Sequence, residues 1–271
     1  MTQSPKRTVF LISDHTGITV QTIAKTLLSQ FESVVFERVT LPFVDSPEKL
    51  RQACGRIDTQ SAQSGLKPIV LSSLTDSRLR AQLRCCQGLV LDVFDAFIGA
   101  LEKELSQPAS RVVGRAHGAP DQAAGQRRIK ALRFALRTED GVQIEDYPRA
   151  DLIVLGASRC GKTPVCLYLA MHNGLNVAQY SLNEDELAAG VLPGLLWPYR
   201  AKLCGLLVEP LQLAANREER RPGSGYASAG QCAKEIEAAR ALYTAEQIPF
   251  LDAKSMSVEE MAVRLLRCCK L

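Results

Sequence analysis

The sequence DLIVLGASRCGKTPVCLYLAM, residues 151–171, decides the fold of the second half of the chain. Its first five residues form an apolar run typical of a buried strand, and residues 163–171 have the apolar spacing of a helix. Between them, residues 156–163 match the pattern GxxxxGK[ST]. In this pattern the N–H groups of a loop surround a phosphate, and the next helix directs its positive dipole end towards it. We therefore predict a phosphate-binding loop between a strand and a helix.

The positions of this loop have different predicted roles. Gly156 and Gly161 supply a permissive backbone, whereas Lys162 reaches the terminal phosphates of a nucleotide. Thr163 offers its hydroxyl to Mg²⁺. Arg159 either adds a phosphate contact or points into solvent, and we predict that Arg159 and Lys162 are catalytic. The predicted nucleotide-binding residues are Gly156, Ala157, Ser158, Arg159, Cys160, Gly161, Lys162 and Thr163.

Short apolar runs alternate with segments of helical period along the whole chain, which indicates largely parallel α/β sheets. Strands are expected at residues 8–13, 33–40, 68–72, 89–93, 151–155, 176–180, 202–208 and 249–251. Helices are expected at residues 16–31, from 46 onwards, at 76–86, 95–105 and 127–137, after the glycine loop, and at 228–247 and 257–269.

The alternation lapses between residues 106 and 126, where Gly, Pro, Ala and Ser are frequent. We therefore predict two parallel-sheet α/β halves. The first is an N-terminal domain at residues 1–105, followed by a flexible linker at 106–126. The second, at residues 127–271, is a P-loop kinase-like nucleotide-binding domain.

Composition narrows the class of protein. The chain has 271 residues, is 46% hydrophobic and carries a formal net charge of +4. Its basic and acidic residues are mostly interspersed, which argues against a dedicated nucleic-acid binder. The apolar run at residues 9–12 is too short for a membrane span or a signal segment. Nine cysteines, an odd number without a CxxC pair, indicate reduced thiols. We expect a cytoplasmic protein with no nucleic-acid or membrane partner.

Ser13-Asp14-His15-Thr16-Gly17 follows the first strand, where α/β sheets gather ligands, so Asp14 is a third predicted catalytic residue. The alternative is that Asp14 or Thr16 caps the next helix. Seven basic residues stand against one acid between residues 106 and 137. They suit a phosphorylated or acidic partner, or simply a solvated helix face.

The segment NREERRPGSGY, residues 216–226, offers either mobile arginines that close over a phosphate or a charged helix end. The acid that completes a Mg²⁺ site is Glu209 or Asp252, because both end apolar runs. The sequence decides neither between the two roles of this segment nor between Glu209 and Asp252.

Four motifs in order resemble the bacterial phosphoenolpyruvate synthase regulatory proteins, relatives of the plant pyruvate, phosphate dikinase regulatory proteins. They are SDHTGIT at 13–19, LGASRCGKTPVCLYLA at 155–170, NREERRPGSGYAS at 216–228 and QCAKEIEAA at 231–239. The resemblance implies a bifunctional enzyme acting on phosphoenolpyruvate synthase. One activity uses ADP to phosphorylate and inactivate a threonine of the partner. The other removes that phosphate with inorganic phosphate and releases pyrophosphate.

This implied reversal needs a second anion position, for which Arg159, the linker arginines, Arg217, Arg220 and Arg221 are candidates. Alternatives to the regulator are the same chemistry on pyruvate, phosphate dikinase, a small-molecule P-loop kinase, and a non-catalytic nucleotide sensor. The small-molecule kinase leaves the large N-terminal half unexplained.

Overall fold

The computed structural model describes residues 6–110, 122–139 and 143–269. The chain divides into two compact units, residues 1–119 and 120–271. Each unit contains one parallel four-stranded sheet, and the strand order is equivalent in the two: β2-β1-β3-β4 and β6-β5-β7-β8. The predicted fold class, two parallel-sheet α/β halves, is confirmed.

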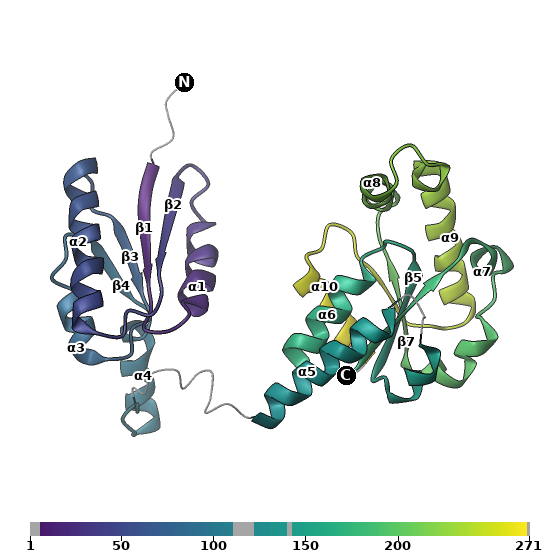
Figure 1. The fold of residues 1–271 in the computed structure, drawn as a ribbon, viewed down its shortest axis with the longest axis horizontal. Helices are drawn as coiled ribbons and strands as arrows, with labels where there is room; N and C mark the ends of the chain where they lie inside the picture. The colour runs from purple at the N-terminus through teal and green to yellow at the C-terminus, as the bar shows by residue number, and fades with distance from the viewer. Residues whose placement is uncertain (1–5, 111–121, 140–142, 270–271) are drawn as a thin grey trace. The chain divides into compact units, whose positions relative to one another are not determined.

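The first unit has strands β1 (Lys6–Ile12), β2 (Val35–Leu41), β3 (Ile69–Ser72) and β4 (Leu89–Asp92). Its helices are α1 (Ile18–Leu28), α2 (Pro47–Ser64), α3 (Ser77–Leu83) and α4 (Asp95–Leu105). Alternate side chains of β1 point to opposite faces of the sheet. Val9 and Leu11 pack with α1, whereas Phe10 and Ile12 pack with α2 and α3. One helix therefore covers one face and two helices cover the other (Figure 1).

The second unit has strands β5 (Leu152–Ala157), β6 (Val177–Leu182), β7 (Leu203–Leu207) and β8 (Phe250–Asp252). Its α-helices are α5 (Gln122–Arg137), α6 (Lys162–Asn173), α7 (Glu184–Ala189), α8 (Pro210–Arg220), α9 (Ala229–Ala245) and α10 (Val258–Cys268). Three 3-10 helices complete it: η3 (Ile144–Arg149), η4 (Gly194–Lys202) and η5 (Gly225–Ala227).

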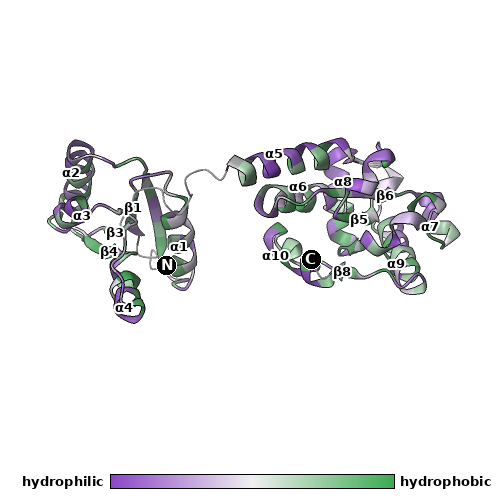
Figure 2. Cartoon of the chain, turned by 90° about the horizontal axis from the view of Figure 1, so that it is seen from below, coloured by the Kyte–Doolittle hydropathy of each residue, from purple (hydrophilic) through white to green (hydrophobic). Residues whose placement is uncertain are grey.

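The sheet of the second unit lies between two helix layers. Helix α6 packs against α5 and α10 on one face, and α8 packs against α9 on the other (Figure 1). All six residues of β5 are buried, as expected for a central parallel strand. Hydrophobic and hydrophilic residues alternate along α5 (Figure 2). Its Phe134 is buried in the core while Arg133 is exposed. One side of α5 therefore packs on the core of the second unit, and the other side faces solvent.

The expected secondary structure agrees closely with the observed elements. All eight strands occur within two residues of their expected ends, and α4 has the expected bounds. The start at Ser46 is confirmed, since its side chain accepts a hydrogen bond from the Lys49 N–H and Pro47 occupies the first turn.

Helix α5 begins at Gln122, earlier than the expected residue 127, because Ala123 and Ala124 are strong helix formers. The division between the units falls inside the segment 106–126. Residues 111–121 lie outside the described part of the chain, so a flexible linker remains a prediction. Within the described ranges, no helix combines the length and the hydropathy needed to cross a membrane.

Candidate functional site

The segment 156–163 runs from the carboxyl end of β5 into the start of α6. From β5 the chain crosses to its neighbour β6 on one side, whereas β7 and β8 lie on the other side. Ligands of open parallel sheets bind outside the carboxyl ends of strands where the order reverses in this way. The fold therefore places this segment at the preferred ligand position of the second unit.

The glycines of the segment are required by its geometry. A Cβ on Gly156 would lie 2.5 Å from Cys160 Sγ and 2.9 Å from the carbonyl oxygen of Leu206. Gly161 has a φ of 95° and Arg159 has a φ of 73°, a left-handed conformation that is uncommon for a residue with a side chain. Such strained residues cluster at functional sites.

The N-terminal end of α6 has free hydrogen-bond donors. Gly161 is its N-cap, and no side chain caps the helix. The N–H groups of Ser158, Arg159 and Gly161 donate to no other group among the residues that the structure describes. The loop carbonyls, by contrast, are engaged: Asn216 Nδ2 donates to the Arg159 oxygen at 3.2 Å. Free N–H groups at a helix N-terminus form an anion site.

The Lys162 ammonium is buried inside this loop, and the side chain is only 3% exposed. Its Nζ donates to the carbonyl oxygens of Gly156 at 3.1 Å and Ala157 at 2.8 Å, and lies 3.9 Å from Cys160 Sγ. None of these partners is a carboxylate. A buried positive charge without a counter-charge is costly, so an anion bound beside the loop would compensate it.

A cavity of about 240 Å³ opens beside the loop. Its lining residues are Glu139, Ser158, Arg159, Gly161, Lys162, Thr163, Pro164, Gln179, Asn216 and Glu219. Five of the predicted nucleotide-binding residues are therefore brought together on one cavity. The other three face elsewhere: Gly156 and Ala157 belong to the buried strand β5, and the Cys160 side chain is buried in the core.

Oxygen atoms gather around Thr163 in this cavity. Its Oγ1 lies 3.1 Å from both Glu139 Oε1 and Gln179 Oε1. Gln179 is buried, and its Nε2 has no hydrogen-bond partner within the described part of the chain. A hydroxyl, a carboxylate and an amide oxygen are hard ligands that suit Mg²⁺, which typically takes one or two carboxylates and fills its other positions with phosphate and water. This donor set fits a magnesium ion bound with a phosphate.

The acid at this position is not one of the two proposed from sequence. Neither Glu209 nor Asp252 lines the cavity. Glu209 lies 3.5 Å from Lys254 Nζ, and Asp252 Oδ2 accepts a hydrogen bond from Arg240 at 2.7 Å. The choice between Glu209 and Asp252 stays a prediction, and Glu139 is a third candidate for the acid. Glu209 and Asp252 lie at the ends of β7 and β8, whereas the carboxylate that meets Thr163 follows α5.

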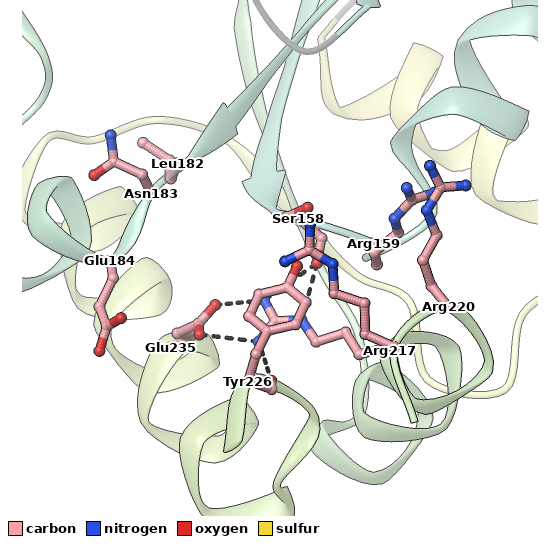
Figure 3. A pocket seen from close by; sticks show the side chains of 10 residues that line it. Ser158, Arg159, Leu182, Asn183, Glu184, Arg217, Arg220, Tyr226 and Glu235 are labelled. Atoms are coloured by element: carbon pink, nitrogen blue, oxygen red, sulfur yellow. Dashed lines mark hydrogen bonds and ion pairs between the residues drawn. The ribbon is translucent and has the colours of Figure 1, made fainter. Parts of the chain in front are cut away.

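A second cavity, of about 400 Å³, shares Ser158 and Arg159 with the first. Arg217, one of the predicted mobile arginines, is fully buried in its wall. Its guanidinium donates to the Ser158 carbonyl at 3.2 Å and to both carboxylate oxygens of Glu235, at 2.9 and 2.5 Å (Figure 3). The Tyr226 ring stacks 3.9 Å from it. Arg217 is a fixed support of the loop, and its role as a mobile contact is wrong.

Asp14, the third predicted catalytic residue, belongs to the first unit and is 6% exposed. Its Oδ2 accepts hydrogen bonds from the backbone N–H and the hydroxyl of Thr75, at 2.7 and 2.6 Å. It therefore ties the loop after β1 to the loop after β3. The alternative of a helix cap is wrong, because the N-cap of α1 is Gly17 and no side chain caps it.

Residues 9–266 match the protein family described as Kinase/pyrophosphorylase. The chain belongs to this family. Relatives at 42% identity from Hahella chejuensis, 41% from Legionella pneumophila and 44% from Alcanivorax borkumensis each align over 96% of this chain and 96% of their own length. All three have the provisional name phosphoenolpyruvate synthase regulatory protein. The resemblance inferred from four motifs is confirmed, and the Kinase/pyrophosphorylase family is one of phosphotransferases by its description.

Sequence reasoning missed Glu139, Gln179 and Asn216. Gln179 gave one signal, since it is an amide side chain within the strand VAQYSL, and the structure shows it buried there. Asn216 stood in a segment considered only for its arginines. Glu139 gave no signal of its own, because its position against Thr163 depends on the packing of α5 along α6.

Proposed function

We propose that this protein is a bifunctional regulator of phosphoenolpyruvate synthase. In one direction it transfers the β-phosphoryl group of ADP to a threonine of the synthase, and in the other it removes that group with inorganic phosphate. The family description and the names of the relatives support this choice of chemistry and partner. Free thiols at all nine cysteines suit a cytoplasmic protein.

The buried ammonium of Lys162 is the observation on which the proposal rests. It is held across the loop by two carbonyl groups, next to free N–H groups and a cavity. This arrangement suits the terminal phosphates of a nucleotide, whose charge the ammonium and the helix dipole would offset. ADP binding through residues 156–163 is therefore part of the proposal.

In the forward reaction, the threonine hydroxyl oxygen attacks the β-phosphorus of ADP. The bond between that phosphorus and the α-phosphate oxygen breaks, AMP leaves, and the hydroxyl proton passes to solvent. The loop N–H groups and Lys162 stabilise the charge on the transferring group. Arg159, on the same cavity, is positioned to add a further positive charge.

Magnesium would be held by the Thr163 hydroxyl and the Glu139 carboxylate. When bound, it would neutralise phosphate charge during the transfer. The amide of Gln179 orients the Thr163 hydroxyl through a contact of 3.1 Å. Asp14 remains a prediction as a catalytic residue.

In the reverse reaction, an oxygen of hydrogen phosphate attacks the phosphorus of phosphothreonine. The bond to the threonine oxygen breaks, that oxygen takes the proton of hydrogen phosphate, and pyrophosphate is released. Charge balances, because two dianions give one neutral hydroxyl and one tetra-anion. This reaction requires two phosphate groups to lie side by side, so repulsion between them must be offset by nearby cations.

The test is incubation of the pure protein with phosphoenolpyruvate synthase and ADP labelled in its β-phosphate. The proposal predicts label on a synthase threonine together with AMP. Transfer from ATP to a free metabolite would instead identify a small-molecule kinase, and binding without transfer would identify a sensor. A parallel reaction with pyruvate, phosphate dikinase decides between the two partner enzymes.

A further inference from the structure

The cavity of about 400 Å³ beside the loop is lined mainly by charged side chains. Its cations are Arg159, Arg217, Arg220 and Arg221, and its acids are Glu184 and Glu235. Glu235 is already neutralised by Arg217 inside the wall. Burial lowers the pKa of Arg217, but the hydrogen bond and charge of Glu235 outweigh it and raise that pKa above its usual value. The ion pair of Arg217 with Glu235 adds no net charge to the cavity.

Three guanidinium groups remain for a ligand. No carboxylate lies within 4.0 Å of Arg159, Arg220 or Arg221 among the residues that the structure describes. The other acid, Glu184, accepts a hydrogen bond from Gln231 at 3.0 Å. Figure 3 shows Arg159 and Arg220 on one side of the cavity and Glu184 on the opposite side. One side of the cavity is therefore an arginine cluster that lacks counter-ions.

The cluster has a rigid support. Ser158 and Arg159 are held by α8, since Arg217 binds the carbonyl of the first and Asn216 binds that of the second. Arg220 lies one helical turn further along the same helix. Planar guanidinium groups bind phosphate oxygens in pairs of hydrogen bonds, and a fixed backbone lowers the entropic cost of binding.

We infer that this cavity is a second phosphate site, which binds a tetrahedral phosphate dianion while the neighbouring cavity holds the nucleotide. The two cavities meet at Ser158 and Arg159. The chemical role of the site rests on the proposed function, because phosphorolysis needs a phosphate nucleophile next to phosphothreonine. Binding of phosphate itself does not depend on that function.

Isothermal titration calorimetry of the full chain with sodium phosphate, at constant ionic strength, tests the inference. Phosphate should bind the wild type both without ADP and with saturating ADP. At saturating ADP, Arg220→Gln and Arg221→Gln should each weaken phosphate binding by about tenfold, the loss expected for a charge-assisted hydrogen bond. Both variants should keep the wild-type affinity for ADP. Arg264→Gln, an exposed position on α10, removes the same charge outside the described cavities and should change neither affinity.

Absence of phosphate binding to the wild type at saturating ADP would overturn the inference, as would unchanged phosphate affinity in Arg220→Gln and Arg221→Gln under that condition. Wild-type protein that binds phosphate through these arginines but does not bind ADP would refute the proposed function and leave the phosphate site standing. A phosphothreonine peptide distinguishes the two sources of such a group. If it displaces phosphate, the cavity takes phosphothreonine, and if both bind together, the cavity takes free phosphate.

Discussion

Arg217 on α8 and Glu235 on α9 form a buried ion pair with two hydrogen bonds, Nη1 to Oε1 at 2.9 Å and Nη2 to Oε2 at 2.5 Å. The same guanidinium reaches the Ser158 carbonyl. The pair therefore connects two helices to the turn within residues 156–163. It fixes the carbonyl group of Ser158, next to Arg159 with its left-handed φ of 73°.

Removing one partner of this pair should be strongly destabilising. Glu235→Ala leaves the Arg217 charge buried and unpaired, which typically costs about 3–5 kcal/mol. Glu237→Ala on the same helix removes an exposed carboxylate and should change the free energy of unfolding by less than about 0.5 kcal/mol. Urea unfolding followed by the fluorescence of Trp197, the single tryptophan, reports on the second unit. Equal effects of the two substitutions would refute the structural role of the pair.

Much of the fold could be predicted from sequence because periodicity reports burial directly. The apolar run DLIVL becomes a strand buried on both faces, and Ser46 with Pro47 marks the start of α2. Charge is less informative about burial. The run NREERR suggested solvent exposure, yet Arg217 is buried because it lies four residues after the buried Leu213, on the same face of α8.

The site was only partly predictable, because sequence spacing reports local structure and not the packing of distant segments. Residues within the GxxxxGK[ST] pattern can be recognised from their spacing in the sequence. Glu139 and Gln179 meet Thr163 through the packing of α5 and β6 around α6, a tertiary relationship that no local spacing reveals. The two acids chosen from sequence end apolar runs, but neither of them lines this cavity.

Glu139 provides the test of the proposed magnesium site. Glu139→Gln removes the charge of the carboxylate beside Thr163 while keeping its size. We expect ADP affinity without Mg²⁺ to change little, whereas the increase in affinity on adding MgCl₂ should be reduced by about tenfold or more. Calorimetric titrations of ADP with and without MgCl₂ measure this. Glu209→Gln serves as the control, and a larger effect there than at Glu139 would favour the acid at the end of β7.

Gly156 should tolerate no side chain. In Gly156→Ala the new methyl group meets Cys160 Sγ and the Leu206 carbonyl at less than contact distance, and overpacking of this kind costs about 1–3 kcal/mol. Gly230 on α9 has open space around its position, so Gly230→Ala should be neutral or slightly stabilising. Unfolding monitored at Trp197 compares the two. A stable Gly156→Ala protein with unchanged ADP affinity would contradict the loop geometry.

The stability of the second unit should fall as pH rises above about 9. Burial raises the pKa of the Cys166 thiol to about 12 in the folded protein, from an ordinary value of 9.0. The unfolded state therefore loses this proton first, and the stabilisation present below pH 9 disappears as pH rises towards 12. Between pH 8 and pH 10 this single thiol contributes about 1 kcal/mol of the loss.

Urea unfolding at both pH values, in wild type and in Cys166→Ala, isolates this contribution. The substitution lowers stability at both pH values because it leaves a small cavity, but its pH dependence should be shallower. A pH dependence that is identical in the two proteins would show that Cys166 does not titrate in this range.

Phosphorolysis distinguishes the proposed regulator from an ordinary kinase with a separate phosphatase. Synthase carrying labelled phosphothreonine is incubated with the wild-type protein in the presence and absence of unlabelled inorganic phosphate, and the released label is separated by chromatography. The account predicts that label leaves only when phosphate is present and is recovered as pyrophosphate. Label recovered as orthophosphate, at a rate independent of added phosphate, would contradict it.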